Sequence, residues 1–195
     1  MKKLNGKLTK LNIAVFISGR GSNLRSIILD SLKKNSVYKV KIVISNKKKA
    51  KGLLLAKKKG IKNYIVDFTK SKKLGLEVLR KLNKNKIKLV CLAGFMKIVP
   101  SYFIKQYKGK IINIHPSLLP KYKGLDTHKR VILNKEKFTG CTVHYVNKLL
   151  DSGKIIIQER ISLKKKDTVQ SIKKKVLKLE HKIYPIAIKK VLITL

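Results

Sequence analysis

Short apolar runs recur along the chain, and between the early ones lie patterns typical of amphipathic helices. The strand-like runs span residues 12–18, 41–45, 87–93, 110–115, 142–146 and 154–161. The helix-like patterns span residues 23–33, 49–59 and 72–82. Strands that are apolar on both faces and alternate with helices are typical of a parallel sheet covered on both sides. The sequence therefore predicts the α/β class: a single domain with a mostly parallel, Rossmann-like central sheet covered by helices on both faces.

The C-terminal segment has the periodicity of one long helix. Apolar residues recur there at steps of three and four, at Val169, Ile172, Val176, Leu179 and Ile183. This spacing predicts a buried stripe on a helix over residues 168–192, with Asp167 or Thr168 as its N-cap. We expect Pro185 to kink or interrupt the helix, because proline lacks the backbone N–H that an internal helical position needs.

The composition allows one compact folded domain. The chain has 195 residues, of which 44% are hydrophobic, and a chain of this size buries roughly 68–75% of its unfolded surface. The recurring apolar runs exclude an intrinsically disordered chain. No run of about 18 apolar residues occurs, so the sequence predicts no membrane span and no membrane partner.

Two features of the sequence bear on its cellular location. Residues 1–10 are basic, but no apolar signal-peptide core with a small-residue cleavage site follows them. Cys91 and Cys141 lie singly in apolar segments, without metal-ligand spacing. We interpret them as buried, reduced thiols, and the predicted location is cytoplasmic.

The charge is extreme: 49 basic and 9 acidic side chains give a formal net charge of +40. Such a charge favours nucleic-acid binding, since cations on phosphates release counterions. However, only five basic residues are arginine, the residue best suited to bidentate recognition, and there is no Trp for base stacking. The lysines fall in short runs along the whole chain. We therefore interpret the charge as compositional drift and expect no specific nucleic-acid partner, with a non-catalytic nucleic-acid-binding protein as the alternative.

A glycine-containing loop, residues 18–24, follows the first predicted strand and opens the first predicted helix. Backbone N–H groups at such a helix start form an anion site, which Gly19 and Gly21 leave accessible. A dinucleotide fingerprint would need a third glycine where Leu24 stands, and an acidic residue after the second strand, where Ser45-Asn46-Lys47 stands. The loop thus suits a single phosphate group. The alternative is a tight strand-to-helix turn capped by Asn23.

Asn113 and His115 form the most informative pair in the sequence. They lie two residues apart on a predicted strand, so both side chains leave the same face, and Pro116 ends the strand just after His115. Ligands of open α/β sheets bind at the carboxyl ends of the strands. There an amide can donate to an oxyanion while an imidazole donates or shuttles a proton.

Asp151 is the predicted carboxylate partner of His115. It lies in Leu149-Leu150-Asp151-Ser152-Gly153, between two apolar strands. It would orient the imidazole and favour its protonated form; the alternative is a turn residue, because Asp-Ser-Gly is typical turn chemistry. His128 and His144 are further side chains that could approach this cleft. No three of these residues have metal-ligand spacing, so no metal is predicted.

These motifs resemble the phosphoribosylglycinamide formyltransferase (GAR transformylase) family, a branch of the folate-dependent formyltransferases. The resemblance runs from about residue 12 to residue 185. Its matching segments are residues 17–24, 92–98, 113–120 (Asn-Ile-His-Pro-Ser-Leu-Leu-Pro), 140–146 with Asp151, and 180–185. The 113–120 run is typical of the folate formyltransferases as a group, while the phosphate loop and Glu180-His181 narrow the resemblance to this branch.

The resemblance implies a reaction and a set of catalytic residues. The amine of 5′-phosphoribosylglycinamide (GAR) would attack the formyl carbon of 10-formyltetrahydrofolate directly, in de novo purine (IMP) biosynthesis. Asn113, His115 and Asp151 would be catalytic: the first two stabilise the tetrahedral oxyanion, and Asp151 holds His115 and assists proton transfer.

The resemblance also implies the binding residues. GAR would be bound by Gly21, Ser22, Asn23 and Glu180. Folate would be bound by Asn113, by Met96, Lys97, Ile98 and Val99, and by Asn147, Lys148, Leu149 and Leu150. Its partners would be these two small molecules, with 10-formyltetrahydrofolate as co-substrate, and it would act as a monomer or homodimer. Residues 1–11 are predicted to be a short basic extension and residues 12–195 the formyltransferase domain.

Two other folate enzymes share the predicted catalytic residues. Methionyl-tRNA formyltransferase has an additional C-terminal domain, and formyltetrahydrofolate deformylase has an N-terminal regulatory domain. The sequence ends with the long helix and has only about ten residues before its first strand. We therefore expect neither of these, and keep both as alternatives.

Overall fold

The computed structural model describes residues 3–4 and 7–195. The strands are β1 (Lys3–Leu4), β2 (Lys7–Leu8), β3 (Leu11–Ile17), β4 (Tyr38–Ser45), β5 (Lys62–Ile65), β6 (Leu89–Leu92), β7 (Lys110–His115), β8 (Phe138–Tyr145) and β9 (Ile155–Ser162). The helices are α1 (Ser22–Ser31), α2 (Lys51–Lys58), α3 (Lys72–Lys84), α4 (Ser101–Gln106), α5 (Thr127–Leu133) and α6 (Val169–Ile193). Part of the predicted extension, residues 1–2 and 5–6, lies outside the described residues.

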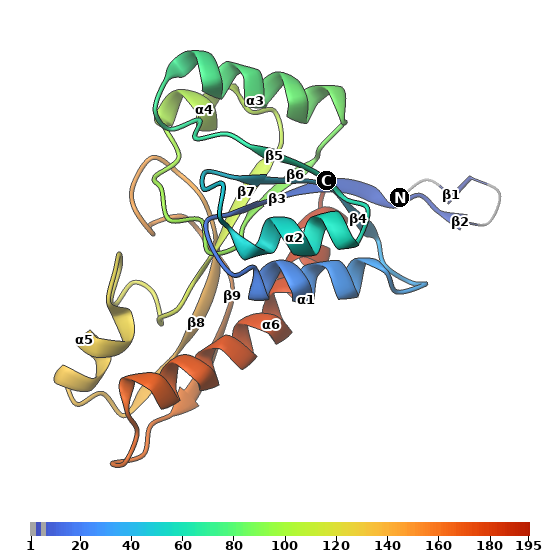
Figure 1. Cartoon of the computed structure of the whole chain (residues 1–195). Helices are drawn as coiled ribbons and strands as arrows, with labels where there is room; N and C mark the ends of the chain where they lie inside the picture. The colour runs from blue at the N-terminus through green and yellow to red at the C-terminus, as the bar shows by residue number, and fades with distance from the viewer. Residues whose placement is uncertain (1–2, 5–6) are drawn as a thin grey trace.

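The central sheet has seven strands in the order β5-β4-β3-β6-β7-β8-β9. The first five strands in this order are parallel, whereas β8 is antiparallel to both β7 and β9. This arrangement confirms the predicted mostly parallel sheet. The parallel half forms because βα crossovers bring each new strand back in the same direction, and the long β8–β9 ribbon extends the sheet past the last crossover (Figure 1).

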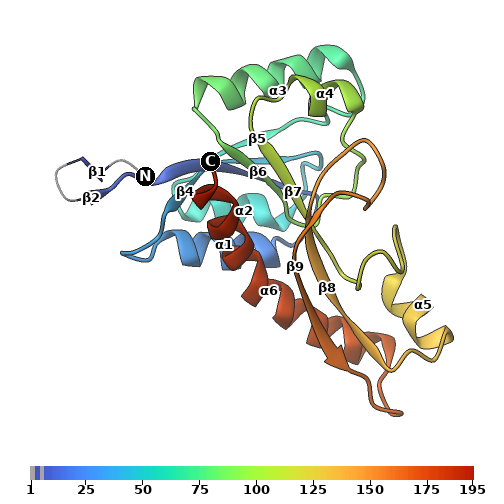
Figure 2. The same ribbon diagram turned by 180° about the vertical axis from the view of Figure 1, so that it is seen from behind.

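Helices cover both faces of the sheet, as predicted. On one face α1, α2 and α6 pack over a core that includes Leu24, Ala56 and Ile188. On the other face α3 and α4 pack over a core that includes Leu82 and Phe103. Figures 1 and 2 show these two helical layers on opposite sides of the strands. Strands β3 and β6 are buried on both faces, which explains their continuous apolar sequence.

Helix α6 is continuous through Pro185, so the prediction of an interruption is wrong. The residues around the proline are buried against the sheet, including Tyr184 and Ile188. The Tyr184 hydroxyl also donates a 2.9 Å hydrogen bond to the carbonyl of Leu92 at the end of β6. These contacts hold the helix together where the proline removes one internal hydrogen bond. The helix begins as predicted, with Thr168 as its N-cap.

Five described elements were not predicted from the sequence: β1, β2, β5, α4 and α5. Strand β5 has the sequence Lys-Asn-Tyr-Ile, is only partly buried and lies at one edge of the sheet. Helices α4 and α5 have six and seven residues, too few for a helical period to stand out.

Candidate active site

Three parallel strands end at one edge of the sheet and carry the loops that form the candidate site. Strands β3, β6 and β7 end at Ile17, Leu92 and His115. The Ser18 hydroxyl ties two of these loops together: it donates to Asn46 Oδ1 at 2.6 Å and accepts from the Met96 N–H at 2.8 Å. The glycine loop and the segment after β6 are thus held side by side.

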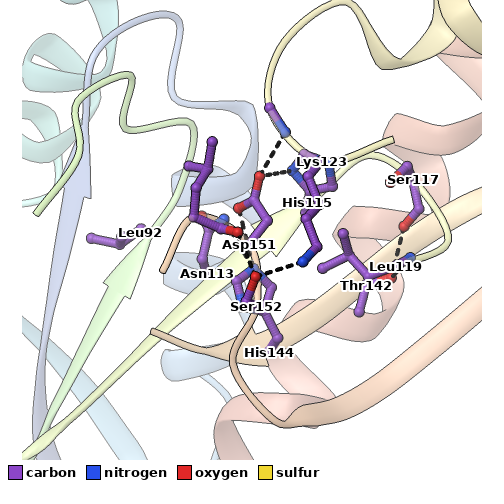
Figure 3. A network of polar contacts seen from close by, with 12 residues as sticks. Leu92, Asn113, His115, Ser117, Leu119, Lys123, Thr142, His144, Asp151 and Ser152 are labelled. Atoms are coloured by element: carbon purple, nitrogen blue, oxygen red, sulfur yellow. Dashed lines mark hydrogen bonds and ion pairs between the residues drawn. The ribbon is translucent and has the colours of Figure 1, made fainter. Parts of the chain in front are cut away.

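His115 and Asp151 lie in contact at this edge, as Figure 3 shows. Nδ1 of His115 is 3.3 Å from Oδ2 of Asp151, and the two side chains are 6% and 8% exposed. The strand β7 delivers the imidazole, and the turn between β8 and β9 delivers the carboxylate. The two predicted partners therefore meet in a nearly water-free setting, where their interaction is stronger than at a surface.

Asp151 is held by its own backbone and by a neighbouring loop. Its φ of 45° lies in the left-handed region, which is uncommon for a residue with a side chain. Its Oδ2 accepts a 2.9 Å hydrogen bond from the Gly124 N–H. Burial raises the pKa of Asp151, but the hydrogen-bond donors around the carboxylate, the Gly124 N–H among them, outweigh burial, so its pKa lies below the ordinary value. Asp151 is consequently ionised at neutral pH.

The other ring nitrogen of His115 faces a backbone carbonyl. Nε2 lies 2.8 Å from the Tyr122 carbonyl oxygen, and because a carbonyl only accepts, Nε2 carries the proton. Burial lowers the pKa of His115 below its ordinary value, outweighing the Tyr122 carbonyl and the Asp151 carboxylate, which act in the opposite direction. The ionised Asp151 carboxylate also only accepts, so Nδ1 of His115 donates to it when the ring is protonated, and Nε2–H is a donor in both the neutral and the protonated ring.

Asn113 lies beside this pair, on the same strand, β7, as His115. Its Nδ2 is 3.3 Å from Nε2 of His144, the residue directly opposite it on β8. Nε2 of His144 is in turn 3.6 Å from Oδ1 of Asp151. The structure thus brings Asn113, His115 and Asp151 together, with His144 between the amide and the carboxylate (Figure 3).

The loop that follows His115 is tied to the antiparallel ribbon. The Thr142 hydroxyl on β8 donates to the Ser117 carbonyl at 2.7 Å and accepts from the Leu119 N–H at 3.1 Å. Gln158 on β9 donates to the Leu119 carbonyl at 2.9 Å. The Leu119–Pro120 peptide bond is cis. These contacts fix the course of the chain between His115 and Tyr122.

The glycine loop leaves the start of α1 without a side-chain cap. Gly21 is the N-cap residue, with φ of 78°, and no side chain accepts from the first turn. The alternative in which Asn23 caps the turn is therefore wrong. Gly52, at the start of α2, packs on the loop: its N–H donates to the Gly19 carbonyl at 3.1 Å, and a Cβ on Gly52 would lie 3.2 Å from Gly21 Cα. Uncapped N–H groups at a helix start favour an anion.

Asn23 turns instead toward α6 and Glu180. Its Nδ2 donates a 2.6 Å hydrogen bond to Oε2 of Glu180, and the two residues are 6% and 8% exposed. Burial raises the pKa of Glu180 to about 7, although the hydrogen bond from Asn23 acts in the opposite direction. Oδ1 of Asn23 is buried with no hydrogen-bond partner. Two acceptor groups are thus held beside the uncapped helix start.

The two segments predicted to meet folate expose apolar side chains at the same edge. Met96, Ile98, Leu149 and Leu150 are 65%, 69%, 64% and 53% exposed, while Lys97, Asn147 and Lys148 are exposed polar residues. Val99 differs, because its side chain is buried in the core. Phe95 stacks on Phe68 with ring centroids 5.6 Å apart, which anchors the first segment. Exposed apolar clusters of this kind mark ligand or partner surfaces.

Other features of the molecule lie outside this cluster. A cavity of about 570 Å³ at the opposite edge of the sheet is lined by five lysines, Lys10, Lys39, Lys41, Lys59 and Lys62, among other residues. Both cysteines are buried free thiols. Within residues 3–4 and 7–195, no three His, Cys, Asp or Glu side chains are grouped as a metal site. The helices of the described part are all too short or too polar to cross a membrane.

The fold and this cluster of polar side chains place the chain among the α/β enzymes. It belongs to the formyl transferase family, whose model matches residues 11–188. This confirms the resemblance found in the motifs.

Individual relatives narrow the comparison. The chain is 39% identical over 182 residues to the phosphoribosylglycinamide formyltransferase of Escherichia coli strain K12, covering 91% of this chain and 85% of the relative. It is 40% identical to the trifunctional purine biosynthetic protein adenosine-3 of Gallus gallus, but spans only 19% of that protein. The crystal structure of phosphoribosylglycinamide formyltransferase from Anaplasma phagocytophilum superimposes with a TM-score of 0.87 at 39% identity, covering 93% of this chain and 86% of that one.

Sequence reasoning missed the groups that hold the cluster in place. The Tyr122 carbonyl and the Gly124 N–H are backbone groups, which have no signature in a sequence. Gly52 does not lie in any of the motifs that the sequence contains. His144 was predicted only to approach the cleft, and its position opposite Asn113 follows from the register of an antiparallel pair that the sequence does not specify.

Proposed function

We propose that this chain transfers the formyl group of 10-formyltetrahydrofolate to the amine of 5′-phosphoribosylglycinamide, in de novo purine biosynthesis. The observation that carries the proposal is the contact of buried Asp151 with His115, beside Asn113. The names of the relatives, above all the Escherichia coli formyltransferase, support the choice of substrates. Catalytic roles for Asn113, His115 and Asp151 are part of this proposal.

The nucleotide end of the site would be formed by α1 and α6. The N–H groups of Ser22 and Asn23, with Gly21 allowing close approach, would bind the phosphate. Glu180 and the unpartnered Oδ1 of Asn23 offer two acceptors next to that phosphate. The Asn23 oxygen has no donor and Glu180 has a second carboxyl oxygen besides the one bonded to Asn23, so both can accept from the hydroxyl groups of a ribose.

The folate end would be formed by residues 96–99 and 147–150. The exposed side chains of Met96, Ile98, Leu149 and Leu150 suit a flat, partly apolar ligand such as a pterin with its benzoyl group. Backbone groups of the exposed residues Lys97, Asn147 and Lys148 would meet the polar edge of the pterin. Since the Val99 side chain is buried, Val99 would take part only through its backbone.

The reaction would run through a tetrahedral intermediate. The GAR amine attacks the formyl carbon, and the formyl oxygen becomes an oxyanion. Nδ2 of Asn113 and Nε2–H of His115 donate to this oxygen, the latter after exchanging its bond to the Tyr122 carbonyl. The bond between the formyl carbon and N10 of the folate then breaks. The proton lost by the amine reaches N10 through water, assisted by the ionised Asp151, leaving formyl-GAR and tetrahydrofolate.

The finer expectations about the protein form part of the same proposal. No metal takes part, because the oxyanion has two hydrogen-bond donors and the nucleophile is an amine. The protein acts in the cytoplasm on small molecules, as a monomer or homodimer, with residues 12–195 as its formyltransferase domain.

The test is to mix the purified protein with 10-formyltetrahydrofolate, with and without GAR, and to follow tetrahydrofolate release and the formylated product. GAR-dependent release with stoichiometric formyl-GAR is the expected result. Release of formate without GAR would identify a deformylase, and would contradict the proposal. No release under either condition, with salt-sensitive binding to polyanions that His115→Ala leaves unchanged, would favour the nucleic-acid-binding alternative.

A further inference from the structure

His144 is a buried imidazole that the proposed reaction does not use directly. Its side chain is 3% exposed, and it lies on β8, directly opposite Asn113 on β7. Its two ring nitrogens face different groups: Nδ1 is 2.9 Å from the carbonyl oxygen of Tyr145, and Nε2 is 3.3 Å from Nδ2 of Asn113. A buried ring with both nitrogens so close to polar atoms is fixed in orientation.

The contact with Tyr145 determines which nitrogen of His144 carries the proton. A carbonyl oxygen only accepts hydrogen bonds, so Nδ1 of His144 must be the donor. In the neutral ring Nε2 then has a lone pair and no hydrogen. It can accept a hydrogen bond, and the group that faces it at 3.3 Å is the amide nitrogen of Asn113, a donor. Donor and acceptor are therefore matched only for this tautomer.

A charged His144 fits the surroundings less well. An Nε2–H would face the Asn113 amide nitrogen, so two donors would meet at 3.3 Å. Its alternative acceptor, Oδ1 of Asp151, is more distant at 3.6 Å, beyond ordinary hydrogen-bond length. The carboxylate of Asp151 already has partners at its other oxygen, the Gly124 N–H and His115. The distances thus favour the neutral ring bound to Asn113.

We infer that His144 is a positioning residue that selects the orientation of the Asn113 amide. An asparagine side chain can present either its oxygen or its nitrogen to a given point, and the two ends are nearly equal in size. An acceptor at Nε2 of His144 holds the nitrogen end in place. One amide hydrogen is then used on His144, and the second is free to donate to the oxyanion. The catalytic consequence of this inference rests on the proposed function, because that function assigns the second Asn113 N–H to the negative charge that develops on the formyl oxygen.

The first test compares two substitutions of His144. In His144→Gln the side-chain oxygen can still accept from Asn113, whereas His144→Met fills a similar volume without a strong acceptor. We expect His144→Met to lower kcat about tenfold, the effect of losing about 1.4 kcal/mol of positioning, with the KM of GAR and folate nearly unchanged. His144→Gln should recover most of the lost kcat. Wild-type kcat in a folded His144→Met would overturn the inference.

Two double-mutant cycles then identify the group through which His144 acts. If it acts through Asn113, His144→Met should add no further loss in an Asn113→Ala background. In an Asp151→Asn background it should still cost about tenfold. Full additivity with Asn113→Ala, or coupling to Asp151 in its place, would overturn the inference and assign His144 to the carboxylate.

A third measurement separates this inference from the proposed function. The Asn113 side-chain NH₂ resonances in a ¹⁵N spectrum, assigned by their absence in Asn113→Ala, report the amide without any substrate. We expect one of the two hydrogens to be shifted downfield, with the shift lost in His144→Met and kept in His144→Gln. The same two resonances in all three proteins would overturn the inference. An inactive wild-type protein that still shows the shift would contradict the proposed function and support the positioning.

Discussion

Oδ2 of Asp151 lies 3.3 Å from Nδ1 of His115, and the carboxylate reaches this point from a turn residue with φ of 45°. The left-handed backbone aims the side chain inward, where the Gly124 N–H also binds it. A carboxylate held in this way stabilises positive charge on the imidazole at the moment when a proton is moved. Asp151, the residue that the proposed mechanism most needs to hold in place, thus has this uncommon backbone conformation.

Removing the charge of Asp151 should impair turnover with little change in fold. Asp151→Asn keeps the size and one acceptor for Gly124, but can no longer stabilise the charged imidazole. We expect kcat to fall about 10²–10⁴-fold, measured as GAR-dependent tetrahydrofolate release. Glu159→Gln is the matched control, since its side chain is 40% exposed and pairs with Lys182 at 3.6 Å. Equal kcat in both variants would count against a catalytic role for Asp151.

Glu180 should make the free energy of unfolding fall as the pH rises, which is the opposite of the effect of most carboxylates. Its pKa is about 7 in the folded protein, against 4.5 as the ordinary value, so between these values the folded state holds a proton that the unfolded state has lost. Its contribution is fully present below pH 4.5 and is lost as the pH rises through about 7. The Glu180→Gln variant cannot lose this proton, and should therefore gain stability relative to wild type over that range.

The measurement is the free energy of unfolding in urea at pH 5 and pH 8, for wild type, Glu180→Gln and the partly exposed control Glu159→Gln. We expect the difference between wild type and Glu180→Gln to grow in favour of the variant at pH 8. Parallel pH dependence of these two proteins would show that Glu180 is ionised with an ordinary pKa in the folded state.

Gly52 should matter for nucleotide binding although it lies on α2. A Cβ at this position would meet Ile17 Cδ1 at 2.5 Å and Gly21 Cα at 3.2 Å, so Gly52→Ala should displace the glycine loop. We expect the KM of GAR to rise about tenfold, equivalent to about 1.4 kcal/mol, with the KM of folate unchanged. Lys51→Ala, at the exposed first residue of the same helix, is the control. An unchanged KM of GAR in Gly52→Ala would argue against a phosphate site at this loop.

Asp30 should be a stability residue with no effect on turnover. Its side chain is 6% exposed and pairs with Lys189 on α6 at 2.9 Å and Lys33 at 3.0 Å, and it accepts from the Tyr38 hydroxyl at 3.0 Å. Asp30→Ala leaves these partners unmatched, and we expect a loss of about 2 kcal/mol in the free energy of unfolding. Glu77→Ala removes a partly exposed pair with Lys81, whose side chains are 46% and 25% exposed respectively, and should change stability little. Equal stabilities of the two variants would refute this account of Asp30.

The sequence predicted best those elements whose ends are marked chemically. Strand β7 has the predicted bounds, Lys110–His115, because Pro116 cannot continue a ladder, and α6 begins after a threonine cap. Strand β5 was missed because an edge strand with a lysine and an asparagine in four residues has no apolar run. The interruption predicted at Pro185 does not occur, because tertiary packing of its neighbours, which no local pattern reports, offsets the lost hydrogen bond.

Of the candidate site, only the side chains could be predicted from the sequence. The spacing of Asn113 and His115 and the scarcity of acids singled out the residues that the structure brings together. The groups that orient them were not predictable, since the Tyr122 carbonyl and Gly124 N–H are common to every residue type. Their roles depend on the path of the loop after β7, which Thr142 and Gln158 fix from distant strands.

The most direct test of the central claim is the turnover of His115→Ala in the GAR-dependent formyl-transfer assay, with Asn113→Ala beside it. If His115 Nε2–H and the Asn113 amide both donate to the oxyanion, kcat should fall about 10²–10⁴-fold for His115→Ala and about 10²–10³-fold for Asn113→Ala, in proteins that remain folded. Wild-type kcat in folded His115→Ala would contradict the account.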